Sequence, residues 1–154
     1  MKVSDEGLHF ISLWEGCSLK RYADAAGYWT IGVGHLITDS DPQEAWKHKG
    51  IDAEKALQLL KIDIEHAESS INRYVTWPLK QTQHDALTSW CFNVGGYNVK
   101  VSTLVKLLNS SEEGKVGREL VRWNKAGGKI LPGLTRRRKA EAKLFNLGDY
   151  GKGP

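Results

Sequence analysis

Residues 14–35, which read WEGCSLKRYADAAGYWTIGVGH, contain the change of pattern on which the fold depends. Glu15 is the last residue of an amphipathic segment, and Gly16 directly after it is a helix stop signal. Two short extended runs follow at 19–22 and 28–33, and residues 24–27 between them have the composition of a hairpin turn. The sequence therefore predicts a helix that ends at Glu15 and leads directly into a small antiparallel sheet.

Helices are predicted on both sides of this stretch. Ser4 or Asp5 can cap the first helix, whose apolar residues recur at three-residue steps. Asp41 begins a capping sequence for a short helix that ends by residue 50. Asp52 caps the longest periodic run in the chain, about 20 residues of helix that could link two lobes. The apolar residues of that run are Ala56, Leu60, Ile64, Ala67 and Ile71.

The second half of the chain has helical patterns throughout. An apolar helix follows Pro78 and stops at Gly95-Gly96, and Ser102 caps the next helix. Further helical segments cover 120–123 and 135–147, and the tail 148–154 should fray. The fold class is α+β, mostly α, with a small β-sheet N-terminal lobe joined by a long helix to an all-helical C-terminal lobe. We expect a single domain over 1–154, with lobes at about 15–55 and about 75–147 and the first helix packed on the second lobe.

Composition and charge limit what this domain can be. The chain has 154 residues, of which 40% are hydrophobic and 26% charged, as in one ordinary globular domain. Its net charge of +4 favours contact with polyanions, although such a charge is also ordinary for solubility. Cys17 and Cys91 lie far apart without metal-ligand spacing, which argues against a disulfide framework and a zinc site. No signal peptide and no membrane insertion are expected, so the protein should be made in the cytoplasm.

Three residues of the stretch 14–35 have side chains suited to glycoside hydrolysis. Glu15, Asp24 and Thr30 stand at E-x8-D-x5-T spacing. A carboxylic acid can protonate a glycosidic oxygen while a carboxylate and a hydroxyl activate a water on the other face of the sugar. Apolar neighbours would keep Glu15 protonated, and the polar turn would keep Asp24 ionised. Read singly, they are a helix-terminal acid, a turn former and a strand residue.

Motifs along most of the chain resemble the phage-type lysozymes, the endolysins of glycoside hydrolase family 24. The helix end, the hairpin and residues 30–35 (TIGVGH) resemble the catalytic region of that family. Residues 90–95 (WCFNVG) and 102–104 (STL) are similar to its interlobe helix and the helix after it. Residues 122–128, 131–134 and 136–138, with Glu141 and 144–145, are similar to its C-terminal lobe.

The resemblance implies a lysozyme-like fold and a muramidase. Such an enzyme hydrolyses the β-1,4 bond between N-acetylmuramic acid and N-acetylglucosamine in peptidoglycan and causes host cell lysis. Glu15 would be the general acid, and Asp24 with Thr30 would hold and deprotonate a water. That assignment predicts inversion and a carboxyl separation of roughly 6.5 to 9.5 Å. No cofactor or metal is implied, the protein would act as a monomer, and its release to the wall would need a partner such as a holin.

The resemblance also suggests residues around the catalytic set. Five of them are carried over as cleft-lining candidates: Leu36, Phe92, Asn93, Gly95 and Thr103. Phe92 is equally suited to the core of an apolar helix. His35 is expected behind the site, paired with an acid, as a structural residue rather than a tuner of Glu15. The other histidines, His9, His48, His66 and His84, are expected to be solvated.

Two other functions are compatible with the sequence. A lytic transglycosylase would use the acid but needs no water, so Asp24 and Thr30 argue against it. A noncatalytic wall-binding module would have no reason to hold a desolvated acid. The basic run 136–139, with Lys143, predicts a solvated face of the last helix that binds nucleic acid only weakly and without specificity.

Overall fold

The computed structural model describes residues 1–24 and 26–154 and begins with helix α1 (Asp5–Glu15). Ser4 caps α1, because its hydroxyl accepts a hydrogen bond from the Gly7 N–H at 2.9 Å. At the other end Gly16 has a φ of 74°, in the left-handed region that favours glycine. The chain therefore leaves the helix directly after Glu15, as the sequence predicts.

A three-stranded antiparallel sheet follows, in the order β1 (Ser18–Ala23), β2 (Trp29–Gly32) and β3 (His35–Leu36). The two predicted strands are confirmed to within one residue at each end, and β3 was not predicted. Thr30 lies in the central strand, opposite Tyr22 of β1 and Leu36 of β3. The predicted turn over 24–27 includes Ala25, which lies outside the described residues.

The short helix α2 (Gln43–His48) begins one residue later than its predicted cap allows. Pro42, not Asp41, is at the N-cap position. The Asp41 carboxylate instead accepts hydrogen bonds from the Thr38 N–H at 2.8 Å and the Thr38 hydroxyl at 2.9 Å. Asp41 thus closes the preceding turn, because its side chain bonds backward along the chain.

The long linking helix is divided into α3 (Ala53–Asp63) and α4 (Glu65–Tyr74), which meet at Ile64. Ile64 has a ψ of −13°, the value of a tightened turn, and is fully buried. Its N–H still donates to the Leu60 carbonyl at 2.9 Å, and its carbonyl accepts from the Glu68 N–H at 3.0 Å. The predicted single helix is therefore two helices, joined by a turn that keeps the helical hydrogen bonds.

Helices make up most of the remainder of the chain. They are α5 (Gln81–Val94), α6 (Gly96–Val101), α7 (Thr103–Asn109), the short 3-10 helix η1 (Glu113–Lys115), α8 (Val116–Val121) and α9 (Pro132–Leu147). The predicted stop at Gly95 ends α5, but Gly96 begins α6, which the sequence did not indicate. A small hairpin of β4 (Lys125–Ala126) and β5 (Lys129–Ile130) precedes α9. Gly127 and Gly128 between them both have positive φ, as a two-residue hairpin turn requires.

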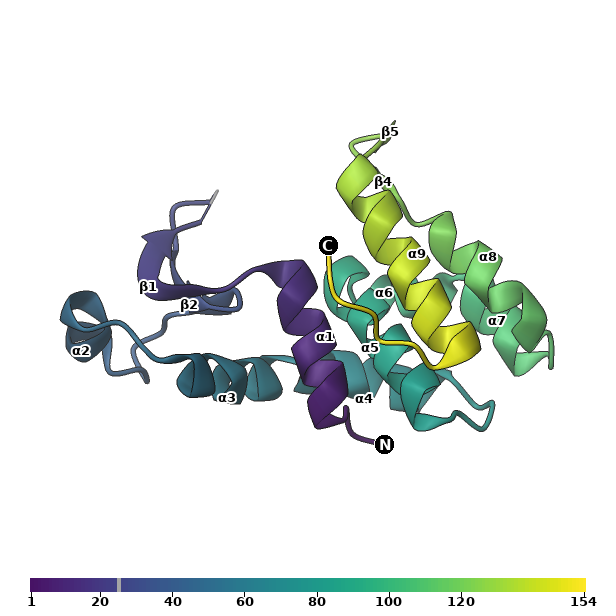
Figure 1. Ribbon diagram of the computed structural model, residues 1–154, viewed down its shortest axis with the longest axis horizontal. Helices are drawn as coiled ribbons and strands as arrows, with labels where there is room; N and C mark the ends of the chain where they lie inside the picture. Colours follow the sequence, from purple (N-terminus) through teal and green to yellow (C-terminus); the bar gives the residue numbers. More distant parts are fainter. Residues whose placement is uncertain (25) are drawn as a thin grey trace.

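Two apolar cores lie beneath these elements. The smaller core contains Ile31 of β2 with Trp46 and Leu59. The larger core contains Phe10 and Ile11 of α1 together with buried residues of α3 to α9. Figure 1 shows the sheet and α2 at one end of the molecule, α5 to α9 at the other, and α1 between them. The predicted class, mostly α with a small sheet, is confirmed, and Glu15 lies where the helical part meets the sheet.

The C-terminal tail has a contact that the sequence did not indicate, and one expectation about exposure is wrong. The C-terminal segment after α9 runs back along α1 (Figure 1), where the Tyr150 hydroxyl donates to Asp85 Oδ2 at 2.7 Å. This bond connects Tyr150 of the tail to α5, and the fraying of the tail stays a prediction. His84 is fully buried rather than solvated, because nearly every residue of α5 is covered by its neighbours. Within the described residues, each helix is too short or too polar to cross a membrane.

Candidate active site

Glu15 faces a buried arginine at the C-terminal end of α1. Arg137 Nη1 of α9 lies 2.6 Å from Glu15 Oε1, and the two side chains are 5% and 23% exposed. The partial negative charge of a helix C-terminus disfavours a carboxylate, whereas a guanidinium stabilises it. Glu15 therefore stands between two opposing electrostatic influences. The sequence indicated only apolar neighbours for Glu15, whereas the structure adds a charged one.

Arg137 belongs to a buried charge cluster that also contains Arg138 and Glu141. Glu141 Oε1 is 3.0 Å from Arg137 Nε, and Glu141 Oε2 is 2.5 Å from Arg138 Nη1. Burial raises the pKa of Glu141, although both arginines oppose that change. Burial likewise lowers the pKa of Arg138 against the attraction of Glu141. The prediction of a solvated basic face on the last helix is therefore wrong for Arg137 and Arg138.

The periodicity of α9 contains the signal that could have revealed this cluster. Arg137, Arg138 and Glu141 lie three, four and seven residues after Leu134, on the stripe that continues to Leu144 and Phe145. Both arginines can also reach Glu141, because residues three and four apart are neighbours on a helix. The charged side chains thus occupy positions that normally hold apolar core residues. Sequence reasoning based on charge alone missed them.

Asp24 directly follows β1, and the loop backbone orients its carboxylate. Asp24 Oδ1 accepts hydrogen bonds from the Ala26 N–H at 2.9 Å and the Tyr28 N–H at 2.8 Å. The residue is partly exposed, in agreement with the polar turn expected from the sequence. Its role as a turn former is therefore observed directly, and the carboxylate remains within reach of solvent.

Thr30 and Asp24 are linked through the backbone of Tyr28. The Tyr28 carbonyl accepts the Asp24 N–H at 2.9 Å and the Thr30 hydroxyl at 3.2 Å. Thr30 is only 4% exposed, so its side chain lies at the base of this loop. The structure thus brings Asp24 and Thr30 together at one end of the sheet, whereas the closest charged contact of Glu15 is with α9.

His35 is paired with acids, as expected. Its Nδ1 lies 2.9 Å from Asp63 Oδ2, and its Nε2 lies 3.5 Å from Asp41 Oδ1. Burial acts to raise the pKa of Asp41, but hydrogen bonds from Thr38 and the nearby His35 lower it below its ordinary value. The imidazole also meets the Trp46 ring edge-on, with centroids 6.1 Å apart. His35 therefore ties β3 to α3 and to the loop before α2.

The five cleft-lining candidates are not gathered in one hollow. Asn93 shares a hollow of about 470 Å³ with Glu15, Arg137 and Pro154. Phe92 and Gly95 line another, beside Asp63. Thr103 lines a third with Trp123, and Leu36 is 48% exposed on β3. Only Asn93 therefore shares a hollow with Glu15, and the binding roles of all five stay predictions.

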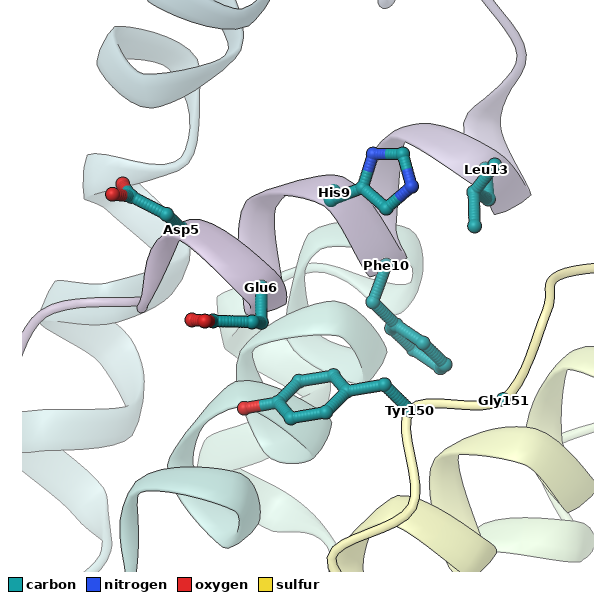
Figure 2. Close-up of a pocket in the computed structure, with 7 residues that line it drawn as sticks. All are labelled: Asp5, Glu6, His9, Phe10, Leu13, Tyr150 and Gly151. Atoms are coloured by element: carbon teal, nitrogen blue, oxygen red, sulfur yellow. The ribbon is translucent and has the colours of Figure 1, made fainter.

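A separate hollow between α1 and the C-terminal segment contains none of the predicted site residues. Figure 2 shows Phe10 of α1 next to Tyr150 and Gly151 of the C-terminal segment, with the Tyr150 ring extending toward Glu6. The two rings meet edge-on at 6.3 Å. This hollow is where the C-terminal segment packs on α1. Elsewhere too, the described residues contain no group of three His, Cys, Asp or Glu side chains that could hold a metal ion.

Comparison with known proteins gives a consistent result over nearly the whole chain. The phage lysozyme family model matches residues 12–141. An endolysin of Acyrthosiphon pisum secondary endosymbiont phage 1 is 38% identical over 153 residues, covering 94% of this chain and 98% of the relative. An endolysin of Bacillus phage B103 is 36% identical over 97% of this chain, but the chain spans only 56% of that relative's length.

The fold has solved counterparts of the same kind. An endolysin from Escherichia coli O157:H7 phage FAHEc1 superposes with a TM-score of 0.86 at 33% identity, covering 99% of this chain and 98% of that one. The matched family segment includes Glu15, Asp24 and Thr30, together with Arg137 and Glu141.

Proposed function

The chain belongs to the phage lysozyme family, and on that premise we propose that it is a muramidase acting on bacterial peptidoglycan. The bond cleaved is the β-1,4 linkage between N-acetylmuramic acid and N-acetylglucosamine. The observation that carries this proposal is the family match over 12–141, which contains a full set of acid, carboxylate and hydroxyl. The chain aligns with nearly the whole length of one endolysin relative and with about half of the other. Both relatives support the same substrate class.

In the proposed reaction, the Glu15 carboxyl gives its proton to the glycosidic oxygen as the bond from that oxygen to the anomeric carbon breaks. Arg137, 2.6 Å from Glu15 Oε1, stabilises the carboxylate that forms. Arg137 thus binds the ionised Glu15 more strongly than the protonated Glu15, so the contact favours proton donation.

Asp24 and Thr30 complete the reaction from the opposite face of the sugar. A water held by the Asp24 carboxylate and the Thr30 hydroxyl attacks the anomeric carbon, and its proton passes to Asp24. The loop backbone fixes the position of Asp24 Oδ1 through two N–H donors, so the carboxylate is oriented before the water binds. Attack by water on the far face inverts the configuration, so the first product formed is the α-anomer.

Access to the wall and assembly state belong to the same proposal. We infer that the enzyme acts as a monomer and reaches the wall through a membrane lesion formed by a holin. Size-exclusion chromatography with light scattering tests the first statement. Coexpression with and without a pore-forming partner, followed by the time of cell lysis, tests the second.

Mass spectrometry of a purified peptidoglycan digest tests the proposed activity. Hydrolysis gives muropeptides with reducing N-acetylmuramic acid ends that have gained one water. Anhydro-muramyl ends would instead identify a lytic transglycosylase, and an intact sacculus would identify a noncatalytic binding module. Proton NMR of the fresh digest then reads the anomer formed first, because inversion and retention give opposite signals.

A further inference from the structure

Glu141 is the most deeply buried acid next to the proposed general acid, and the reaction described above does not use it. The side chain is fully buried, and both of its oxygens have partners. Oε1 accepts hydrogen bonds from the Ser89 hydroxyl at 2.7 Å and from Arg137 Nε at 3.0 Å. Oε2 accepts from Arg138 Nη1 at 2.5 Å. Glu141 thus links α5 to both arginines of α9.

Arg137 is held on the side that faces away from Glu15. Its Nε donates to Glu141, and its Nη2 donates to the Ser89 carbonyl at 3.1 Å. Its Nη1 lies 2.6 Å from Glu15 Oε1, as an ion pair without hydrogen-bond geometry. Because a guanidinium is planar and rigid, fixing two of its nitrogens fixes the third. The direction of the contact with Glu15 is therefore set by α5 and α9, before any substrate binds.

The charges of the cluster balance only when Glu15 is ionised. Arg137 and Arg138 carry two positive charges, and Glu141 carries one negative charge. The Glu15 carboxylate supplies the second negative charge, and a protonated Glu15 leaves the cluster at +1. In a buried site each of these charges acts over several ångströms with little screening. The charge of Glu141 therefore opposes the tendency of the two arginines to remove the proton of Glu15.

We propose that Glu141 is a positioning residue for the general acid: with Ser89 it orients Arg137, and with Arg138 it sets the net charge that Arg137 presents to Glu15. This inference rests on the proposed function, in which Glu15 must carry a proton. Arg138 is the counterpart of Glu141 in this role, because Asn93 Oδ1 and Glu141 Oε2 accept from its guanidinium and hold its charge in the cluster.

The groups that face Glu15 come from four elements. Arg137 contacts it from α9, Arg138 acts on it at longer range, and Arg136 lines the same hollow. The α5 helix contributes the neutral Asn93, α1 contributes the neighbouring Trp14, and Pro154 comes from the C-terminal segment. The nearby side-chain charges in this hollow are therefore those of α9, which makes them open to a test by substitution.

The test compares pH profiles of kcat/KM on purified peptidoglycan for three variants. Glu141→Gln keeps a carbonyl acceptor for Arg137 but leaves one more positive charge, so the basic limb of the profile moves to lower pH by about one unit. Arg138→Met removes a positive charge, so the basic limb moves to higher pH. The double variant Arg138→Met with Glu141→Gln restores the charge balance, and its limb returns to within about 0.3 units of the wild type.

A titration that needs no activity provides the second readout. Protein is prepared with 13C-labelled glutamate, and the carboxyl signal of Glu15 is assigned by its loss in Glu15→Gln. In each variant the titration midpoint of this signal moves in the same direction as the basic limb of the pH profile. A wild type that hydrolyses nothing contradicts the proposed function and leaves this titration as the test of the inference. Glu141→Gln leaves the buried Arg138 without its charged partner, which is a known cause of misfolding. In the double variant Arg138 is absent and Arg137 keeps Glu15 as its charged partner, so this variant and Arg138→Met decide the question where Glu141→Gln does not fold.

The matched control is Glu112→Gln, which removes the acid of an i, i+3 pair with Lys115 and lies in neither the hollow of Glu15 nor the buried charge cluster. Its profile and its titration coincide with those of the wild type. Two outcomes overturn the proposal. In one, the basic limb of the pH profile stays in place in all folded variants. In the other, it moves in the same direction in both single variants. In that case Glu141 only fills space and pairs charges in the core.

Discussion

Arg137 Nη1 of α9 lies 2.6 Å from Glu15 Oε1 at the end of α1, so the two ends of the matched family segment meet at one ion pair. The helix that carries the proposed acid is anchored in the larger core by Phe10 and Ile11. The arginine is anchored by Glu141 and Ser89. Neither partner can move without disturbing packed residues, which makes the contact a fixed part of the site.

Glu15→Gln should abolish peptidoglycan hydrolysis, because an amide cannot donate the required proton. The same change should lower the free energy of unfolding by about 1–3 kcal/mol, since Arg137 loses its charged partner in a nearly buried place. A desolvated acid without a cation beside it would predict the opposite sign of the stability change. Turbidity loss of a cell-wall suspension and calorimetry measure the two effects. Glu6→Gln, at the other end of α1, is the control and should remain active.

Asp24→Asn should lower kcat by at least about 100-fold while leaving the fold intact. The amide oxygen can still accept hydrogen bonds from the Ala26 and Tyr28 N–H groups, so the loop keeps its shape. What is lost is the base that takes the proton of water. Kinetics on purified peptidoglycan, with circular dichroism of the same sample, separate the two. Asp39→Asn, a loop acid elsewhere, should match the wild type, and full activity of Asp24→Asn would transfer the water to another residue.

Thr30→Val and Thr30→Ser form a matched pair at the base of the loop. Valine preserves the volume but removes the hydroxyl, so activity should fall by about tenfold or more. Serine keeps the hydroxyl and should retain most of the rate. The stability cost of valine should be only about 1 kcal/mol, because the Tyr28 carbonyl still accepts the Asp24 N–H. Equal rates for the two variants would mean that Thr30 is only a strand residue.

His35→Gln should destabilise the protein by about 1–3 kcal/mol, because it breaks the links to Asp63 and Asp41. Urea unfolding measures this loss. His48→Gln, whose exposed pair with Glu44 spans 3.6 Å, should change stability by less than about 0.5 kcal/mol. The rate of folded His35→Gln at low temperature should stay near that of the wild type. A rate loss without a stability loss would make His35 a tuner of Glu15 instead.

Asp85 should account for part of the acid sensitivity of the fold. Burial acts to raise the pKa of Asp85, but neighbouring His84 and hydrogen bonds from Ser4, Tyr150 and Gln81 lower it below its ordinary value. Since the folded pKa lies below the unfolded one, its contribution is complete above about pH 4 and is lost as pH falls through the folded value. Tyr150 reflects the same contact, because burial and the nearby acid raise its pKa to about 12.

Asp85→Asn therefore has a pH-dependent effect on stability. At pH 7 the variant should be less stable than the wild type by about 1–3 kcal/mol, and the difference should narrow as the pH falls from about 4 toward 2. Urea unfolding over this pH range measures the difference. Asp5→Asn, on the exposed side of α1, should show a difference of less than about 0.5 kcal/mol throughout. A constant difference for Asp85→Asn across this range would contradict the role of its charge.

Local patterns were sufficient to predict much of the secondary structure. The caps at Ser4, Asp52 and Ser102, the stop at Gly16 and both longer strands are found where the sequence indicates them. These signals work because caps, turns and periodic apolar faces depend on residues only a few positions apart. The break at Ile64 and the start of the short helix α6 were not predicted. Each depends on the backbone conformation of a single residue, which does not change the composition of the sequence around it.

The sequence by itself determined the first helix, both longer strands and several helix caps, because these follow from short-range spacing, and with the family resemblance it singled out Glu15, Asp24 and Thr30. Only the tertiary structure decided that Arg137 and Arg138 are buried, that Glu141 joins them to α5, and that Glu15 faces Arg137. The physical reason is that burial and charge pairing depend on which distant elements pack together. Helical spacing within α9 does not show which element packs against its buried face.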